Sequence, residues 1–518
     1  MYTPSLDKFC ELFKGGGRVP VMREMSLRDE SSVSVIEKLG LAGSPLCLLE
    51  SGKGLENLAR HSFLGFSPHC IFRSMGDNIE ITANGSRIQV KGDPYLELQN
   101  LFESYKGKRF EGLPKFWGGA LGYFSYDMGR YFEKLPELTV DDLEVPEACF
   151  MFCDHVICFD HLDKTMKIIV TPDPETVSGP EEAYRKAFGE ITRIVQLIRH
   201  GKPGDPVYIG NVDRALQNSF QPECNVTKEQ FEEMVRKCKE YIRAGDIFQA
   251  NLSLRLGKKT GVDPFFLYKV LRQLNPSPYM SFIDFGDLHI VCSSPELLVR
   301  LDGNLAETRP IAGTRKRGAD REEDLSLARE LISNEKERAE HIMLVDLERN
   351  DLGRVCRYGT VEVDELMVIE EYSHVMHIVS NVRGRLAEGR DRFDLLRACF
   401  PGGTITGAPK IRSMEIIEEL EPTRRGPYTG SIGFLGYAEE MEMNIVIRTL
   451  LVKDGKSYVQ AGAGIVADSD PEREYFESLK KAEALLRTLE IADEMTQENM
   501  TVPHEEKKFA IGGELANA

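Results

Sequence analysis

The chain mixes strand-like runs with helical segments and lacks the strict strand–helix alternation of a parallel sheet. Strand-like runs bounded by glycine turns occur at 44–51, 70–75 and 77–83. An amphipathic pattern predicts a helix at 227–245, with Thr227 as its N-cap and Gly245 as its C-cap. This mixture predicts an α+β fold.

Changes in composition along the chain predict two lobes. The connector at 201–224 is rich in Pro, Gly and Asn and has little hydrophobic periodicity. We therefore expect one lobe at 1–200 and a second at 225–491. Residues 492–518 lose apolar periodicity and are expected to form a frayed tail.

The charge and the cysteine pattern restrict the partners and the compartment. The formal net charge is −18, which argues against a nucleic-acid partner or an anionic membrane partner. No apolar stretch approaches the length of a membrane span, and residues 1–13 lack the pattern of a signal peptide, so a cytoplasmic location is expected. The eleven cysteines show no C-x-x-C pair or zinc spacing, which predicts reduced core thiols.

Two acidic stretches have the same internal spacing. Glu337 and Glu340 lie three residues apart, as do Glu474 and Glu477, and on a helix such residues share one face. If the two faces meet, they offer hard oxygen ligands for Mg²⁺, which commonly binds one or two carboxylates together with an anionic substrate. The alternative for each pair is an ordinary solvated helix face.

Three glycine-dense segments accompany the acidic pairs, at 310–314 (PIAGT), 401–410 (PGGTITGAPK) and 460–469 (QAGAGIVADS). Glycine permits close backbone approach to a ligand, and threonine adds a hydroxyl that binds carboxylates. None of the segments has the pattern of a phosphate-binding loop, and an ordinary tight turn is the alternative for each. Arg448 and Tyr428 lie in neighbouring strand-like runs, where the arginine needs an anionic partner.

Together with EHIMLVDLERND at 340–351 and SHVMHIVS at 373–380, these segments resemble a known family. The chain resembles the large subunits of chorismate-utilising enzymes, namely anthranilate synthase component I and aminodeoxychorismate synthase component I. The resemblance implies a large antiparallel β-sandwich flanked by helices. It also implies that 225–491 is the chorismate-binding catalytic domain and that 1–200 is the N-terminal lobe of this family.

The resemblance assigns roles to individual residues. Glu340 and Glu477 match the magnesium ligands, and Glu337 and Glu474 are expected to support the metal through water. Glu296 matches the acid that protonates the departing hydroxyl, and burial is expected to raise its pKa. His377 matches the histidine beside the substrate, with a core histidine bonded to a backbone carbonyl as the alternative. The positions that match the substrate-binding residues are Gly313, Thr314, Thr404, Tyr428, Arg448, Gly462, Ala463, Gly464 and Lys481.

Two further positions indicate the nucleophile. Gln249 stands where water-adding isochorismate and salicylate synthases carry a lysine base, and because glutamine cannot deprotonate water, ammonia is the expected nucleophile. Ala312 stands where many aminodeoxychorismate synthases carry a lysine that attacks carbon 2 of the ring. Alanine at this position is typical of anthranilate synthase.

The surrounding segments are more similar to the aminodeoxychorismate type, notably QANLS at 249–253, FPGGTITGAPK at 400–410 and YTGSIGF at 428–434. The sequence therefore favours aminodeoxychorismate synthase component I, of the folate and 4-aminobenzoate pathway. The alternative is anthranilate synthase component I, of the tryptophan pathway. Two other classes are weaker candidates: a water-adding synthase, which Gln249 opposes, and a catalytically silent tryptophan sensor, which the full set of matched residues opposes.

The resemblance also implies an effector and a partner. Ser51, Pro278, Tyr279 and Met280 match the tryptophan-binding positions of anthranilate synthase, with ordinary packing as the alternative. No cysteine lies in the G-x-C-x-G setting of a glutaminase nucleophile. A separate glutamine amidotransferase subunit is therefore expected to supply the ammonia.

Overall fold

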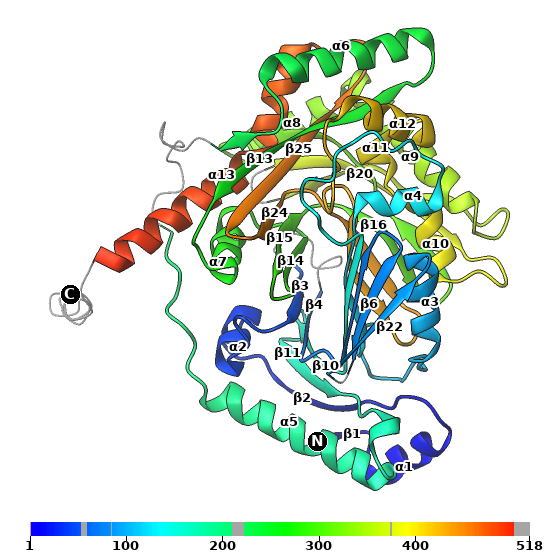
Figure 1. The fold of residues 1–518 in the computed structure, drawn as a ribbon, viewed down its shortest axis with the longest axis vertical. Helices are drawn as coiled ribbons and strands as arrows, with labels where there is room; N and C mark the ends of the chain where they lie inside the picture. Colours follow the sequence, from blue (N-terminus) through cyan, green and yellow to red (C-terminus); the bar gives the residue numbers. More distant parts are fainter. Residues whose placement is uncertain (1, 53–59, 84, 210–221, 373–374, 502–518) are drawn as a thin grey trace.

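The computed structural model describes residues 2–52, 60–83, 85–209, 222–372 and 375–501. Ser373 and His374 of the SHVMHIVS motif, part of the connector and the end of the tail lie outside the described residues. The described chain forms two large sheets with helices packed around them (Figure 1).

The first sheet has thirteen strands among the described residues, in the order β1-β2-β11-β10-β4-β3-β14-β15-β24-β25-β13-β12, with β21 beside β13. All of its pairs are antiparallel, as the family resemblance implies. Its strands are β1 (Tyr2–Thr3), β2 (Val21–Ser26), β3 (Leu46–Glu50), β4 (His61–Phe66), β10 (His155–Asp160), β11 (Thr165–Val170), β12 (Glu223–Cys224), β13 (Gln249–Lys259), β14 (Tyr279–Asp284), β15 (Leu288–Ser294), β21 (Gly407–Ala408), β24 (Thr449–Lys453) and β25 (Lys456–Ile465).

The second sheet has twelve strands among the described residues, in the order β18-β20-β17-β16-β23-β22-β8-β9-β5-β6-β7, with β19 beside β20. It is also antiparallel. Its strands are β5 (Cys70–Met75), β6 (Asn78–Ala83), β7 (Ser86–Lys91), β8 (Gly119–Phe124), β9 (Ala148–Cys153), β16 (Leu297–Asp302), β17 (Leu305–Thr308), β18 (Ile311–Lys316), β19 (Glu362–Glu371), β20 (Val375–Arg385), β22 (Ser431–Gly436) and β23 (Met441–Ile445).

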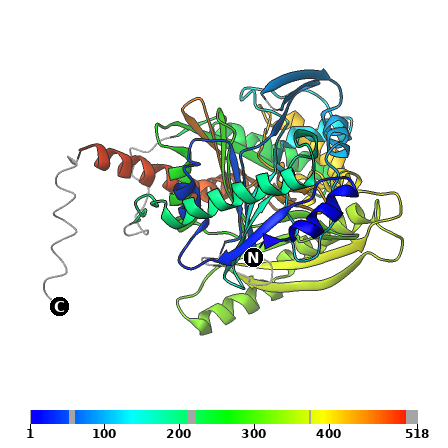
Figure 2. The ribbon, with the colours of Figure 1, turned by 90° about the horizontal axis from the view of Figure 1, so that it is seen from below.

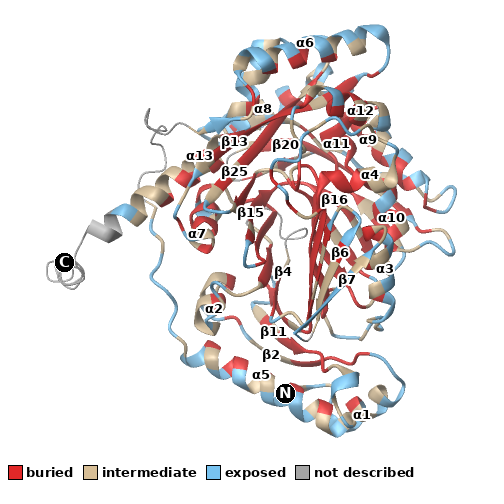
Figure 3. Ribbon diagram, viewed as in Figure 1, coloured by how far each residue is buried: buried red, intermediate tan, exposed pale blue. Residues whose placement is uncertain are grey.

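The first sheet is buried on both faces. In β3 every residue is buried, and side chains alternate: Cys47 packs in the core between the sheets, whereas Leu46 and Leu48 pack in the core under the helices. Phe63 of β4 meets Phe434 of β22 across the sandwich, with ring centroids 5.5 Å apart. The sheets are therefore two layers of one sandwich, and the buried strands run through its centre (Figure 3).

Helices close the outer face of the first sheet. Helix α5 shows why: its buried residues Ala183, Ala187, Ile191, Ile194 and Ile198 recur every three or four positions and form one apolar stripe. Figure 2 shows α5 lying across the strands β2 and β11 that it contacts. The helices with residues in this core are α1 (Leu6–Lys14), α2 (Ser32–Leu39), α5 (Pro180–His200), α6 (Lys228–Ala244), α7 (Pro264–Leu274), α12 (Lys410–Leu420) and α13 (Pro471–Thr501).

Other helices pack around the second sheet. Helices α3 (Pro94–Glu103) and α10 (Arg392–Cys399) add aromatic and leucine side chains to the core that contains the sandwich interior. Helix α8 (Arg321–Ser333) and helix α9 (Glu335–Gly353) pack against β18 and β20. The remaining helical segments are the short α4 (Gly129–Phe132) and α11 (Gly403–Thr406), with 3-10 turns at Tyr126–Met128 and Pro174–Thr176.

Several sequence predictions are confirmed. The fold is an α+β sandwich flanked by helices, and the strand-like runs form β3, β5 and β6. Helix α6 has Thr227 as its N-cap in a capping box with Gln230, and Gly245 ends it in the left-handed conformation.

The chain is divided less sharply than its composition suggests. Ladders β3–β14 and β8–β22 join strands from the two sides of the connector, so each sheet is built from both predicted lobes. The domain limits at 200 and 225 stay a prediction. Helix α13 continues to Thr501, beyond the point at which the sequence loses its periodicity. In the part of the chain that is described, no helix is long and apolar enough to span a membrane.

The substitution Leu48→Ala is expected to lower the free energy of unfolding by about 2–5 kcal/mol, because it leaves a cavity in a strand buried on both faces. The measurement is the thermal midpoint of the variant and the parent. Leu162→Ala, in an exposed turn, is the matched control and should leave the midpoint almost unchanged. Equal midpoints for all three proteins would contradict the central position of β3.

Candidate active site

The glycine segment at 460–469 lies mainly inside strand β25 and is not a turn. Its ladder with β13 places Gly464 opposite Asn251 and Gly462 opposite Ser253, with the buried Ala463 opposite Leu252. A Cβ on Gly464 would stand 2.3 Å from Gln249 Nε2. The missing side chain at 464 therefore makes the space in which the Gln249 amide lies.

Gln249 links this strand to the first acidic helix. Its Nε2 donates a hydrogen bond to Glu340 Oε1 at 3.3 Å. Its Oε1 is buried and has no hydrogen-bond partner among the described residues. A buried amide oxygen without a partner is costly, so this atom is available to a ligand donor.

The segment at 310–314 forms the start of β18, with a bulge at Gly313. Gly313 has a φ of +61°, and a Cβ there would stand 2.9 Å from Glu337 Oε2. Ala312 is buried and pairs with Ile378 of β20. The bulge thus brings the backbone of β18 against the N-terminal end of α9.

His377 faces this bulge from β20. Its Nδ1 lies 3.0 Å from the carbonyl oxygen of Gly313 and 3.0 Å from Thr314 Oγ1. Because a carbonyl only accepts, we assign the proton to Nδ1, which donates to Gly313. Burial, followed by the nearby Arg448, lowers the pKa of His377 to about 4. The ring is therefore neutral, and its buried Nε2, which lacks a partner among the described residues, is an acceptor.

Glu296 is buried in the short link between β15 and β16. Burial raises its pKa to about 7, while the Thr404 hydroxyl, the Ile311 amide and Arg448 act in the opposite direction. Thr404 belongs to α11, and its Oγ1 is buried without a hydrogen-bond partner in the described chain. A carboxyl with this pKa is well placed to act as an acid at neutral pH.

Arg448 and Tyr428 were predicted on strands, and that part of the prediction is wrong. The run around Arg448 breaks into β23 and β24, and Arg448 lies between them with a φ of +50°. Its carbonyl accepts from Ser293 N at 3.0 Å, which fixes the turn. Tyr428 precedes β22, and the guanidinium of Arg425 lies 5.7 Å from its ring centroid.

The guanidinium of Arg448 has no hydrogen bond or ion pair among the described residues. Burial lowers its pKa, and the nearby Tyr372 and Glu296 oppose this shift. Arg448 is half-buried, and a partly desolvated arginine without a counter-ion is unfavourable, so it offers a strong site for a carboxylate ligand.

The two acidic pairs lie on helices, as their spacing predicts. Glu337 and Glu340 are in the first turns of α9, and Glu474 and Glu477 are in the first turns of α13. Two of the four have an ion-pair partner: Arg315 lies 3.1 Å from Glu337, and Lys481 lies 2.9 Å from Glu477.

The other two carboxyls, Glu340 and Glu474, are half-buried and have no ion pair among the described residues. Burial and then Glu337 raise the pKa of Glu340, and burial raises the pKa of Glu474, to which Glu477 adds. Lys336 and Lys481 lower the pKa of both Glu340 and Glu474. The same two lysines therefore act on both acidic pairs. A divalent cation would stabilise these carboxylates in the same way, and their donor atoms are those that Mg²⁺ prefers.

The carboxyls are not gathered into a preformed cage. Within the described ranges, no group of three or more histidine, cysteine or acidic side chains is close enough to hold a metal ion. This agrees with a magnesium site completed by water and substrate oxygens. The four-glutamate set stays a prediction.

Lys481 connects α13 to the glycine strand. Its Nζ donates to the carbonyl oxygen of Gly462 at 3.0 Å, in addition to its ion pair with Glu477. The predicted residues of β13, β18, β20, β25, α9 and α13 are thus joined by direct contacts into one region. Arg448 lowers the pKa of His377, which belongs to this region, and also the pKa of Glu296. Thr404 also lowers the pKa of Glu296, so Glu296, Thr404 and Arg448 are linked to the same region.

The predicted effector residues lie together elsewhere in the first sheet. Ser51 follows β3, and Met280 of β14 pairs with Glu50 in the β3–β14 ladder. A Cβ on Gly52 would stand 2.0 Å from the carbonyl oxygen of Ser277, so the two segments are in close contact just before Pro278 and Tyr279. Ser51 Oγ donates to the carbonyl of His61 at 2.7 Å.

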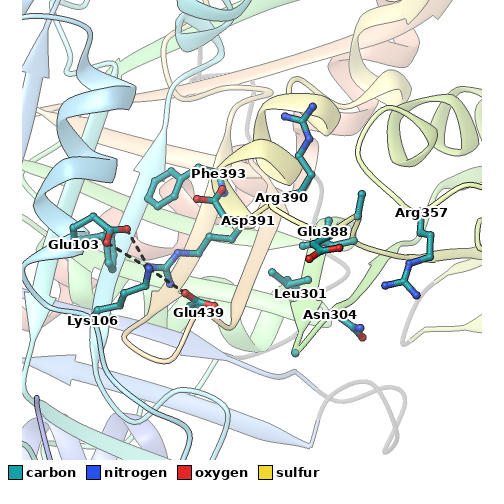
Figure 4. A pocket seen from close by; sticks show the side chains of 15 residues that line it. Glu103, Lys106, Leu301, Asn304, Arg357, Glu388, Arg390, Asp391, Phe393 and Glu439 are labelled. Carbon is teal, nitrogen blue, oxygen red and sulfur yellow. Dashed lines mark hydrogen bonds and ion pairs between the residues drawn. The ribbon is translucent and has the colours of Figure 1, made fainter.

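A hollow of about 340 Å³ lies apart from these residues (Figure 4). It is lined by charged side chains such as Glu103, Arg390 and Glu439, with Lys106 lying 3.4 Å from Glu103. None of the predicted site residues lines it. Gln249 Oε1, His377 Nε2 and Thr404 Oγ1, which are buried without a partner among the described residues, lie outside this hollow.

The sequence reasoning missed a second buried acidic group. Glu348 and Asp351 of α9 are buried, and Lys410 pairs with Asp351 at 2.6 Å. Both acids lie in the motif EHIMLVDLERND, which supported the family resemblance. The signal was their spacing of three residues, the same as in the pairs assigned to magnesium.

Comparison with known proteins identifies the class to which this fold and site belong. The family described as chorismate binding enzyme matches residues 45–487, which cover both sides of the connector. The chain belongs to the chorismate-binding enzyme family.

Relatives with two different protein names match nearly the whole chain. Anthranilate synthase component 1 of Acetivibrio thermocellus is 46% identical over 500 residues, covering 96% of this chain and 100% of that protein. Aminodeoxychorismate synthase component 1 of Bacillus subtilis is 45% identical over 487 residues, covering 93% and 99%. The chain is thus similar to component I of both synthases.

Solved structures agree with this fold. Anthranilate synthase component I of Streptococcus pneumoniae superposes with a TM-score of 0.72 at 35% identity, covering 83% of this chain and 92% of that chain. A menaquinone-specific isochorismate synthase from Escherichia coli has a TM-score of 0.68 at 18% identity, over 91% and 94% of the two chains, and so shows the fold alone.

Proposed function

We propose that the chain is component I of aminodeoxychorismate synthase, which aminates chorismate to 4-amino-4-deoxychorismate with ammonia from a glutaminase subunit. The observation that carries the ammonia assignment is the position of Gln249. Its amide lies against Gly464 and donates to Glu340, where a water-adding enzyme of this family has a lysine base. An amide does not take up a proton near neutral pH, so the site is suited to a nucleophile that arrives uncharged.

The substrate's two carboxylates have complementary partners. The unpaired guanidinium of Arg448 suits bidentate binding of one carboxylate. The glycine strip at Gly462–Gly464, the bulge at Gly313 with Thr314, and Lys481 provide backbone and cationic contacts in the same region. His377 contributes the acceptor Nε2, and Tyr428 completes the substrate-binding set.

Glu296 is proposed as the acid of the reaction. It transfers a proton to the departing ring hydroxyl, which leaves as water, and the ammonium formed on the ring later releases a proton. The overall exchange of hydroxyl for amine is therefore balanced. Thr404 is proposed to orient the acid, because its hydroxyl lowers the pKa of the Glu296 carboxyl and forms no hydrogen bond with any other group among the described residues.

Glu340 and Glu477 would hold Mg²⁺, with Glu337 and Glu474 supporting it through water. When bound, the ion supplies positive charge that offsets the ring carboxylate of the substrate. Within the chain, Lys336 and Lys481 already reduce the mutual repulsion of these carboxylates.

The choice of product depends on the segments around the site. QANLS, FPGGTITGAPK and YTGSIGF favour 4-amino-4-deoxychorismate. Ala312 favours the second candidate, anthranilate synthase component I, because alanine provides no amine for a covalent step. Relatives bearing the two names match at 46% and 45% identity and support both candidates.

The purified chain, with chorismate, Mg²⁺ and ammonium, is expected to give 4-aminobenzoate only when 4-amino-4-deoxychorismate lyase is added. Separation of the products checks this. Anthranilate formed without the lyase would establish the second candidate instead. Glutamine in place of ammonium should give no turnover, because the glutaminase subunit is missing, and absence of any amination would contradict both candidates.

The acid role of Glu296 predicts a pH dependence. The protonated carboxyl is the active form, and its pKa is raised to about 7, so kcat should fall as the pH rises through 7. Glu296→Gln should lower kcat by about 10²–10⁴-fold, the usual contribution of a general acid. A pH profile that stays flat to pH 9, or a fully active variant, would exclude this role.

Glu340→Gln is expected to raise the Mg²⁺ concentration needed for half-maximal rate by about 10–100-fold, because one carboxylate ligand is lost. The measurement is the rate as a function of Mg²⁺. Glu335→Gln, an exposed position in the same helix, is the matched control and should behave like the parent. An unchanged requirement in Glu340→Gln would remove Glu340 from the metal site.

Tryptophan binding at Ser51 and Pro278–Met280 is proposed as regulation. A ligand that binds only the folded chain raises the melting temperature. Tryptophan is therefore expected to raise it and to inhibit turnover, whereas phenylalanine serves as the comparison ligand. If tryptophan has neither effect, these residues are ordinary packing.

A further inference from the structure

Arg425 is a buried arginine in the segment between α12 and β22. Only 2% of its surface is exposed, and its guanidinium carries five N–H donors. All five are used among the described residues: Nε donates to Glu421 Oε2 at 2.9 Å, Nη1 donates to the Ile405 carbonyl at 3.1 Å and to Thr429 Oγ1 at 3.2 Å, and Nη2 donates to Glu421 Oε1 at 2.7 Å and to the Asn251 carbonyl at 2.5 Å. Arg425 therefore has no donor left for a ligand.

Two of these acceptors are chain neighbours of predicted site residues. Ile405 follows Thr404 in α11, and Thr429 follows Tyr428. Arg425 also packs against Tyr428 directly, since its guanidinium carbon lies 5.7 Å from the centroid of that ring. The guanidinium therefore joins the segment that contains Thr404 to the segment that contains Tyr428.

The same guanidinium reaches the glycine strand through β13. Asn251, whose carbonyl accepts from it, is opposite Gly464 in the β13–β25 ladder. Its counter-ion Glu421 accepts from the amide and the hydroxyl of Ser253 at 2.8 and 2.9 Å, and Ser253 is opposite Gly462. The ion pair thus holds β13 at the two positions that face the glycines of the proposed site.

Thr429 shows how firmly this region is held. It is 1% exposed and has a φ of +61°, a conformation that β-branched residues rarely adopt. Its hydroxyl, which accepts from Arg425, donates to the carbonyl of Tyr428 at 2.6 Å, and its N–H donates to the Val446 carbonyl at 2.8 Å. Such a conformation costs free energy and persists where surrounding contacts hold it. The bond from Arg425 is one of the contacts that keep Thr429, and with it Tyr428, in place.

A second buried arginine provides a comparison. Arg18 is 5% exposed and pairs with Asp154 at 2.6 Å, with Asp173 3.7 Å away. Its guanidinium also lies over the rings of Tyr105 and Tyr437. None of these partners is a predicted site residue or adjoins one in the chain. The Arg18 pair therefore matches Arg425 in burial and charge but not in its connection to the site.

We propose that Arg425 is a positioning residue for the substrate, which holds Thr404, Tyr428 and the glycine strand in fixed relative positions through their neighbours. The inference rests on the substrate-binding roles proposed above. Arg425 does not contact the substrate, and its charge stays paired with Glu421, so no proton moves through it. Its contribution is the geometry of the groups that bind chorismate, which predicts an effect on substrate affinity more than on the chemical step.

The test is the kinetics of Arg425→Lys with chorismate, Mg²⁺ and ammonium. Lysine keeps a positive charge beside Glu421, but it has three donors on a flexible stem in place of the planar fork, so the five bonds cannot all be kept. The KM for chorismate is expected to rise about 10–100-fold, the usual cost of a small misplacement, with a smaller change in kcat.

Arg18→Lys is the matched control. Both substitutions weaken a buried ion pair and should lower the melting temperature, but Arg18→Lys should keep the KM of the parent. Loss of folded protein lowers the apparent kcat and leaves KM unchanged, so KM separates positioning from a merely structural role. A second readout needs no turnover: without ammonium, chorismate and Mg²⁺ should raise the melting temperature of the parent and of Arg18→Lys, and should raise that of Arg425→Lys less.

Thr429 provides a second pair of variants, which decides the question if Arg425→Lys does not fold. Thr429→Val keeps the shape and the β-branch but removes the hydroxyl between Arg425 and the Tyr428 carbonyl. Its KM for chorismate should rise about 2–10-fold, the net worth of one hydrogen bond. Thr429→Ser retains the hydroxyl and should return KM to within about two-fold of the parent.

Parent values of KM and of the chorismate-induced melting shift in Arg425→Lys, or in Thr429→Val, would overturn the proposal, and so would an equal rise in KM for Arg18→Lys. The proposed function fails separately. A parent chain whose melting temperature rises with chorismate but which forms no 4-amino-4-deoxychorismate would refute that function, while the melting shifts of the variants would still decide the role of Arg425.

Discussion

The site depends on the long antiparallel ladder between β13 and β25. This ladder places Gly462 opposite Ser253 and Gly464 opposite Asn251, and it brings Gln249 over Gly464. Any Cβ at 464 would occupy the place of the Gln249 amide. The register of one pair of strands therefore decides both the shape of the region and the chemistry that Gln249 provides.

Electrostatics divides the buried and half-buried charges into two groups. Arg18 with Asp154, Arg272 with Glu50 and Arg425 with Glu421 are paired at 2.6–2.7 Å and make further hydrogen bonds within the fold. Removing one partner of such a pair leaves an uncompensated charge, so these pairs hold elements in place. Because each charge in these pairs is already neutralised within the fold, the pairs are not candidates for binding a charged ligand.

Glu296, Glu348 and Arg448 form the other group, because no ion pair neutralises them among the described residues. Their cost to stability has to be offset by the large sandwich core and by the pairs described above. Such groups concentrate at functional sites. Here Glu296 influences the pKa of Glu348, and Arg448 influences the pKa of both Glu296 and the neutral His377.

The sequence by itself determined the fold class, helix α6 with both caps, several strands and the family, because these follow from local periodicity and short motifs. It also indicated Gln249 and the helical spacing of the glutamate pairs. The breaking of the run at Arg448, the strand position of the 460–469 glycines and the mixing of both lobes in each sheet were decided by long-range strand pairing. The burial of Glu348 and of Glu296 was likewise decided only by tertiary packing, because it depends on elements that neither of their segments specifies.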